Sequence, residues 1–279
     1  MFAAFRPWSF LVKRHISAIG VAVALGLAPL PAFANTGALV VRYGLTLAGL
    51  PIGTATVTFH VTDHGTYSIA AAAKVGGVMS LISDGRGSAN ASGHLGSDRP
   101  QPSAYALNSM SGKKPQTVQL ALANGAVTAT DIEPPPAPRG DRIPVRAADK
   151  RGVIDPLSAL LVPVAGDANA LTASACRRTL PVFDGAQRFD IPLSYSRTEH
   201  VRGNGYDGAV IVCSARYVPI AGHRPEREQT KFMAANRDLE FWLAPINGTH
   251  VLAPWRIVVG TQIGRLTIDT IRYGATGSE

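Results

Sequence analysis

Two cysteines, Cys176 and Cys213, are the residues with the clearest chemistry in this sequence. The chain has no Cys-x-x-Cys motif, and no motif places a histidine beside either thiol as a base. A reactive thiol, which needs an activating neighbour of this kind, is therefore the less favoured alternative. In an oxidising compartment two thiols of one chain usually pair. The sequence predicts one structural disulfide, Cys176–Cys213.

Nucleophilic and metal-assisted catalysis need residue patterns that this sequence does not contain. The Gly-x-Ser-x-Gly turn of many serine hydrolases is missing, as are the His-Glu-x-x-His, phosphate-loop and dinucleotide-binding motifs. His60 and His64 have the spacing of two metal ligands on a helix, but their segment has the pattern of a strand that runs into a turn. We therefore expect no metal, no cofactor and no enzymatic activity.

Carboxylates are the basis of an alternative function, because glycosidases place two of them across a cleft. Glu226 and Glu228 are two residues apart, as are Asp238 and Glu240, but Arg and Lys residues surround both pairs, which favours a charged strand edge. The alternative is a periplasmic hydrolase of cell-wall or capsular polysaccharide. Its carboxylates would converge from different strands and would be drawn from Asp84, Asp184, Asp190, Glu226 and Asp238.

Residues 1–34 have the pattern of a secretory signal peptide. A basic start precedes an uncharged, mostly apolar stretch over residues 16–30, and Ala32-Phe33-Ala34 fits the small-x-small site of signal peptidase. The apolar stretch is shorter than the roughly 20 residues of a membrane-spanning helix. We expect cleavage after residue 34, a mature chain of residues 35–279 in the periplasm, and no transmembrane segment after cleavage.

The charge of the chain limits its partners. The 279 residues carry a formal net charge of +8, with the basic residues scattered rather than gathered in a run. They are not interleaved with stacking aromatic residues, so a nucleic-acid partner is not expected. Anionic envelope polymers or lipid headgroups remain open as partners, although scattered charges favour an ordinary solvated surface.

From residue 39 onward, apolar residues recur at every second position. Residues 39–47, 55–61 and 67–75 alternate an apolar face with a polar one, which is typical of half-buried antiparallel strands. Asn124-Gly125 predicts a tight hairpin turn. Further strands are predicted over residues 118–122, 127–129, 189–195, 209–217, 230–234, 239–243, 256–259 and 263–273.

Two segments interrupt the strands. The Pro-rich connector over residues 133–144 must be exposed and extended, because proline removes backbone donors and fixes φ. Asp155 followed by Pro156 predicts the start of a helix that Pro163 ends. The predicted fold is a single all-β domain, mainly antiparallel, with roughly ten to twelve strands and about one to three short helices. Such a sheet must curve into a sandwich or a barrel, and we favour a curved, partly open β-barrel.

A curved sheet of this kind is able to enclose a lipid-like ligand. Residues 75–82 are mostly apolar, and they form either a short helix that plugs one end of the sheet or a mobile flap over a cavity. If the protein binds lipid, we expect its cavity to be lined by Val57, Phe59, Ile69, Met79 and Leu81. The expected function is a non-enzymatic cell-envelope protein. It binds an amphipathic envelope molecule, or it contacts other envelope proteins as a scaffold for envelope integrity.

Several stretches of low individual specificity occur together along the mature chain. They are GLPIGTAT at 49–56, SDGRGSANASG at 83–93, VFDGAQRFDI at 182–191, CSARYVPIAGHRP at 213–225, and residues 242–268 with their Ala-Pro and Pro-x-Arg-Ile elements. Together they resemble the bacterial periplasmic family of the domain of unknown function 3108 (DUF3108). The resemblance implies an exported, β-rich envelope protein with a cysteine pair corresponding to Cys176 and Cys213, and it brings no established catalytic residues. Open β-barrels of the lipoprotein-carrier type often hold acyl chains, which supports a lipid ligand by analogy of fold alone.

Overall fold

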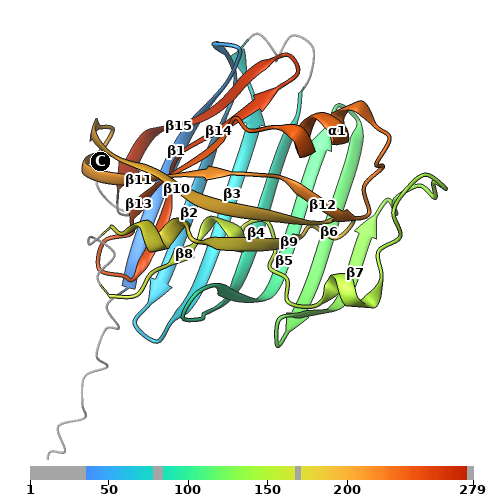
Figure 1. Cartoon of the computed structure of the whole chain (residues 1–279), viewed down its shortest axis with the longest axis horizontal. Helices are drawn as coiled ribbons and strands as arrows, with labels where there is room; N and C mark the ends of the chain where they lie inside the picture. The colour runs from blue at the N-terminus through green and yellow to red at the C-terminus, as the bar shows by residue number, and fades with distance from the viewer. Residues whose placement is uncertain (1–35, 78–83, 167–170, 275–279) are drawn as a thin grey trace, which may run out of the picture. The chain divides into compact units, whose positions relative to one another are not determined.

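The computed structural model of the chain describes residues 36–77, 84–166 and 171–274, and antiparallel strands dominate them (Figure 1). The first seven strands lie side by side in chain order. In β2, Val57, Phe59 and Val61 are buried, while the residues between them are partly or fully exposed. The seven strands are β1 (Thr36–Leu47), β2 (Leu50–Thr62), β3 (Thr66–Val75), β4 (Arg86–Leu95), β5 (Pro100–Ser111), β6 (Lys114–Ala123) and β7 (Ala126–Glu133).

The second half of the chain extends the same sheet on the other side of β1, in the order β12-β10-β11-β13-β14-β15-β1, with β8 beside β14 and β9 beside β10. These strands are β8 (Val162–Pro163), β9 (Arg178–Phe183), β10 (Arg188–Gly203), β11 (Tyr206–Ala215), β12 (Val218–Ala221), β13 (Leu239–Pro245), β14 (Val251–Thr261) and β15 (Gly264–Gly274). The helical elements are the short 3-10 helices η2 (Ala147–Lys150), η3 (Ser158–Leu160) and η4 (Ala173–Cys176), and the α-helix α1 (Glu228–Ala235).

The predicted all-β, mainly antiparallel and partly open barrel is confirmed. All named strand pairs are antiparallel, and the strand order ends at β12 on one side and β7 on the other without joining them. The described part of the chain contains 15 strands, more than we predicted. The pattern missed β4 because its buried positions are held by small residues such as Ala89 and Ala91, which give a weak apolar alternation.

Two local predictions were wrong. The helix expected after Asp155 is only the 3-10 turn η3, because the chain returns to the extended β8 at Val162. The strand expected over residues 230–234 lies inside α1. None of the residues of α1 is buried, so its sequence carries neither a helical nor a strand-like apolar stripe to identify it.

The space enclosed by the sheet is filled by the chain itself. In Figure 1, β9, β10 and β12 cross in front of β3 to β6. Phe183, at the end of β9, is fully buried and packs with Tyr105, Val118 and Leu120 of the strands behind it. A β-carbon placed on Gly185 would lie only 2.7 Å from Val118. The two layers are therefore in direct contact here, with protein side chains as the core.

The Pro-rich connector, residues 133–144, runs from β7, at one edge of the sheet, to the opposite edge at β12. Near its end, the N–H of Ile143 donates to the carbonyl of His223 (3.0 Å), and the N–H of Gly222 donates to the carbonyl of Ile143 (2.8 Å). Gly222 and His223 directly follow β12. The connector thus bridges the two unpaired edges of the sheet, and the described residues form one compact unit. Within the described ranges no helix is both long and apolar enough to cross a membrane.

Candidate functional site

The disulfide predicted from the sequence is confirmed. Cys176, the last residue of η4, is bonded to Cys213 in β11, and both side chains are completely buried. The bond closes a loop across 37 positions and fixes η4 against the sheet. The described part of the chain holds no free cysteine, so the thiols offer no reactive site.

Three of the residues predicted to line a lipid cavity belong to the core. Val57, Phe59 and Ile69 are 6%, 0% and 2% exposed. They pack in one cluster with side chains from both halves of the chain, among them Val41, Leu161, Val210 and Trp255. The side chains of these three residues therefore contact protein. Met79 and Leu81 lie outside the described residues.

A pocket of about 560 Å³ opens further along the same strand face. Its apolar lining includes Val61, which is buried two residues beyond Phe59, and the half-buried Leu95 and Val164, and we call these three side chains its floor. We call it the end pocket, since it lies where the turns β2–β3, β4–β5 and β13–β14 meet the segment after β8. Each of these connections includes a glycine, which lets the backbone turn tightly. The glycines are Gly65, Gly96, Gly166 and Gly248.

The rim of the end pocket is polar. Asp63, Ser97, Thr249 and His250 come from the three turns. The Thr249 hydroxyl donates to the Ile246 carbonyl (2.7 Å), which holds the β13–β14 turn in place. A ring nitrogen of His250 contacts the carbonyl of Gly166, which draws this turn towards the segment after β8. An apolar floor with a few polar groups at the mouth is the usual composition of a small-molecule site.

Arg178 fixes one wall of the end pocket. Its guanidinium donates to the carbonyl of Asp98 (2.7 Å) in the β4–β5 turn and to the carbonyl of Pro163 (2.9 Å) in β8. Burial lowers the pKa of Arg178 from its ordinary value, and the nearby Asp98 carboxylate opposes that change. Asp98 and Pro163, which Arg178 joins, are 65 positions apart in the chain. Sequence reasoning missed this pocket because most of its residues come from loops, and glycine in each loop was the only signal.

The outer face of β2 to β7 carries short side chains. Neighbouring strands place small or polar residues in one row across the sheet, namely His60, Ser68, Ser92, Ala104, Ala121 and Ala129. A shallow groove of about 620 Å³ runs over this face. Tyr105 is among the lining residues, but its side chain is 5% exposed and belongs to the buried cluster that contains Phe183. No Trp, Tyr or Phe side chain of the lining faces the groove, so it lacks the stacking platform that aromatic side chains provide.

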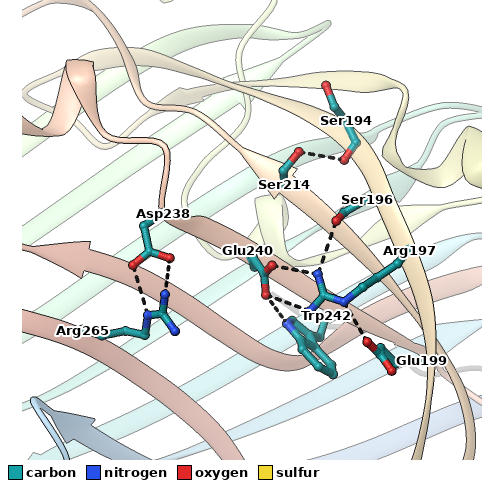
Figure 2. Close-up of polar contacts among 9 residues, drawn as sticks. All are labelled: Ser194, Ser196, Arg197, Glu199, Ser214, Asp238, Glu240, Trp242 and Arg265. Atoms are coloured by element: carbon teal, nitrogen blue, oxygen red, sulfur yellow. Dashed lines mark hydrogen bonds and ion pairs between the residues drawn. The ribbon is translucent and has the colours of Figure 1, made fainter.

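A belt of matched charges crosses the outer face of the C-terminal strands (Figure 2). The Arg197 guanidinium donates to Glu199 (2.7 Å) and Glu240 (2.9 Å) and stacks 5.0 Å from the centre of the Trp242 ring. Trp242 donates its indole N–H to Glu240 (2.9 Å), and Arg256 stacks on the same ring at 4.9 Å. The hydrogen bond from Arg197 holds the pKa of Glu240 below its usual range. Since these charged groups pair with one another, the belt stabilises the contact between β10, β13 and β14.

Most carboxylates of the hydrolase alternative are bonded to separate partners and do not face one another across a cleft. Asp184 accepts the backbone N–H groups of Ala186 (2.8 Å) and Gln187 (2.6 Å) in a turn, and burial raises its pKa. Asp190 pairs with Arg188 (2.7 Å), and Glu226 pairs with Lys231 (2.9 Å). Asp238 pairs with Arg265 (2.8 Å; Figure 2), while Asp84 is exposed before β4. In the ranges that the structure describes, no group of three or more His, Cys, Asp or Glu residues is placed to hold a metal ion.

A buried polar network that the sequence did not reveal joins Asp155, Ser158 and Tyr67. The Ser158 hydroxyl donates to Asp155 (2.5 Å) and contacts the Tyr67 hydroxyl (2.7 Å). Asp155 and Ser158 are completely buried, and Tyr67 is 4% exposed. An acid beside a serine is a familiar catalytic arrangement, but a substrate has no access to this one. Its position between β3 and η3 indicates a role in holding the two layers together.

Fold and site together define a class of protein: an open, barrel-like antiparallel sheet that is braced by one buried disulfide and has a pocket among the turns at one end. The family described as "Protein of unknown function (DUF3108)" matches residues 40–270, so the chain belongs to that family. This confirms the family resemblance seen in the sequence.

The fold is similar to that of a solved structure. The crystal structure of a beta-barrel-like protein of the domain of unknown function DUF1849 from Brucella abortus matches with a TM-score of 0.51 and 9% sequence identity. The match covers 86% of this chain and 98% of that chain. At this identity the likeness shows the fold alone. No curated protein matches the sequence.

Proposed function

We propose that the protein is a non-enzymatic binding protein of the bacterial cell envelope that holds an amphipathic molecule in the end pocket. The observation that carries the proposal is the arrangement of Val61, Leu95 and Val164 beneath a polar rim. An apolar tail would bury itself against these side chains, since burial of apolar area is the main source of affinity in such pockets. A polar head would remain at the rim with Asp63 and His250.

Two features support a location in the periplasm. Residues 1–34 have the basic, apolar and small-x-small pattern of an export signal. The chain also contains a fully buried disulfide, and such bonds persist in oxidising compartments such as the periplasm.

The contacts that the carboxylates make favour a binding function over hydrolysis. A glycosidase needs one carboxyl group as an acid and a second facing it across a cleft. Asp190, Glu226 and Asp238 each form an ion pair with a different basic residue. Asp184 is occupied by the N–H groups of its own turn.

The proposal is tested by loading the pocket. Native mass spectrometry of the protein isolated from its own periplasm should show a co-purified lipid-like mass, and the purified protein should take up a fluorescent fatty acid. Ala165→Trp places a large side chain at an exposed position of the end pocket and should lower uptake by about tenfold or more.

Ala121→Trp is the matched control, because Ala121 is also exposed but lines the groove on the outer face. It should leave uptake unchanged. Loss of uptake in A121W with normal uptake in A165W would place the ligand on the outer face and overturn the end-pocket assignment. A clean apo mass together with no fatty-acid uptake would overturn the proposed function.

A further inference from the structure

The end of the sheet opposite the end pocket carries the two most exposed large apolar side chains among the described residues. Leu50, at the β1–β2 turn, is 56% exposed, and Ile263, at the β14–β15 turn, is 72% exposed. The two turns touch: the N–H of Ala48 donates to the carbonyl of Arg265 (2.9 Å), and Gly264 packs against Ala48. Leu50 and Ile263 are therefore exposed at adjoining turns, and these two turns lie at the top of the view in Figure 1.

Cations lie beside these apolar side chains. Lys74 in β3 is directly opposite Arg86 in β4. At the same end of the sheet, Lys113 lies in the β5–β6 turn and Lys114 is the first residue of β6. All four are exposed, and none forms an ion pair with any residue that the structure describes. Like charges directly opposite each other destabilise a sheet. The Lys74–Arg86 pair is thus an unfavourable contact in the free protein that an anionic partner would relieve.

The apolar and basic groups form one continuous edge. Gly76, which follows β3, donates its N–H to the carbonyl of Ile52 (3.0 Å), so the end of β3 is held next to the start of β2 and Leu50. Arg86 is paired with Met110 in β5, close to the β5–β6 turn. Acidic groups at this edge are few: Asp84 precedes β4, and Asp238 is tied to Arg265. We call this edge the basic rim, defined by Leu50, Lys74, Arg86, Lys113, Lys114 and Ile263.

We propose that the basic rim docks the protein on the surface of an anionic lipid bilayer. Leu50 and Ile263 enter the boundary between headgroups and acyl chains, while the four cations contact the phosphates. A soluble anionic polymer would satisfy the cations but would give the apolar side chains nothing to enter. The inference goes beyond the proposed function and does not rest on it, because the end pocket opens among the turns at the other end of the strands.

Vesicle binding tests the proposal directly. The purified protein should float with vesicles of phosphatidylglycerol and phosphatidylethanolamine and should not float with vesicles of phosphatidylcholine alone. Binding should weaken as salt is added, because salt screens surface charges. Excess inorganic phosphate at constant ionic strength should not displace the protein, whereas displacement would identify a phosphate-ion site instead of a membrane surface and overturn the proposal.

Two double variants separate the contributions. Lys74→Gln with Arg86→Gln should lower partitioning by about 30-fold, since each cation near an anionic surface contributes about 1 kcal/mol. Leu50→Ser with Ile263→Ser should lower it by about tenfold or more, through loss of apolar burial. Both changes are at exposed positions, so neither should lower the thermal melting temperature appreciably, and loss of the Lys74–Arg86 repulsion should raise it slightly.

Matched controls lie elsewhere on the surface. Arg151→Gln with Arg177→Gln removes two exposed cations away from the rim, and Ile271→Ser removes an exposed apolar side chain of β15. These variants should bind vesicles like the wild type. Equal losses in the control and rim variants would show attraction by net charge alone and would overturn the assignment of the rim, as would wild-type binding by both rim variants.

Discussion

The Tyr67 hydroxyl lies 2.7 Å from the Ser158 hydroxyl and so joins β3 to η3, 91 positions later in the chain. Ser158 in turn donates to Asp155, whose other oxygen accepts the N–H groups of Leu157 and Ser158 (2.9 Å each). The segment before β8 is thereby attached to the inner face of the sheet by a chain of buried hydrogen bonds. A buried network of this kind stabilises a fold only while every member keeps its partner.

Removing the two hydroxyl groups should have unequal effects. Tyr67→Phe removes one hydrogen bond and should lower the free energy of unfolding by about 1 kcal/mol. Ser158→Ala leaves both Asp155 and the Tyr67 hydroxyl without their buried partner, so it should cost about 2–3 kcal/mol. Urea unfolding of the two variants and of their combination checks this. A smaller loss in S158A than in Y67F would contradict the role given to Ser158.

The carboxyl group of Asp155 should make stability depend on pH. Burial raises its pKa in the folded protein, and the hydrogen bonds from Ser158 oppose that rise only in part. In the unfolded chain an aspartate titrates near its ordinary pKa of about 3.9. Between these two values the folded protein binds the extra proton, so its free energy of unfolding falls as the pH rises.

Asp155→Asn removes this titration. Relative to wild type, the variant should gain stability as the pH rises from about 4 to beyond the raised pKa, and the difference should then become constant. Urea unfolding at a series of pH values measures it. Asp131→Asn, at an exposed position, removes the same charge from the surface and is the matched control for the change in net charge. Parallel curves for D155N and wild type would show that Asp155 titrates normally in the folded state.

The sequence predicted what depends on local periodicity and missed what depends on contacts between distant segments. The alternation around Val57 and Phe59 correctly indicated a half-buried antiparallel strand, and the two cysteines correctly indicated a disulfide. The same alternation cannot tell whether an inward side chain faces a ligand or other protein side chains. Leu161 and Val210, which belong to the same buried cluster as Phe59, come from parts of the chain that no local pattern connects with β2.

The end pocket could not be predicted from local sequence patterns either. Asp63, Ser97 and His250 have no spacing in the sequence that links them, and only the antiparallel order of the strands brings their turns to one end. The basic residues of the rim were scattered in the sequence for the same reason. Lys74 and Arg86 are direct neighbours in the sheet because β3 and β4 pair in antiparallel register.

The Cys176–Cys213 disulfide should contribute most of its stability by restricting the unfolded chain. Closing a loop of 37 positions is worth about 4 kcal/mol in the loop-entropy treatment. Cys176→Ala with Cys213→Ala should therefore lower the free energy of unfolding by about 3–4 kcal/mol. Urea unfolding with and without reductant is the measurement. Reductant should shift the wild-type midpoint and leave that of the double variant unchanged, and an unshifted wild-type midpoint after complete reduction would contradict the prediction.

Gly185 should tolerate no side chain, because it lies where β9 meets the inner face of β6. Its φ of +102° is a region that other residues rarely adopt, and a β-carbon would lie 2.7 Å from a methyl group of Val118. Gly185→Ala should thus add a steric clash to the backbone strain and cost about 2–4 kcal/mol.

Gly152→Ala is its matched control. Gly152 also has a positive φ, +65°, but a β-carbon there would meet no atom within 4 Å. This variant should cost only the backbone strain, about 1–2 kcal/mol. Urea unfolding of both variants compares a positive-φ position that has a clash with one that has none, and the larger loss should occur at Gly185. Equal losses would mean that a gap remains between the two layers at Gly185, wide enough to accept a methyl group.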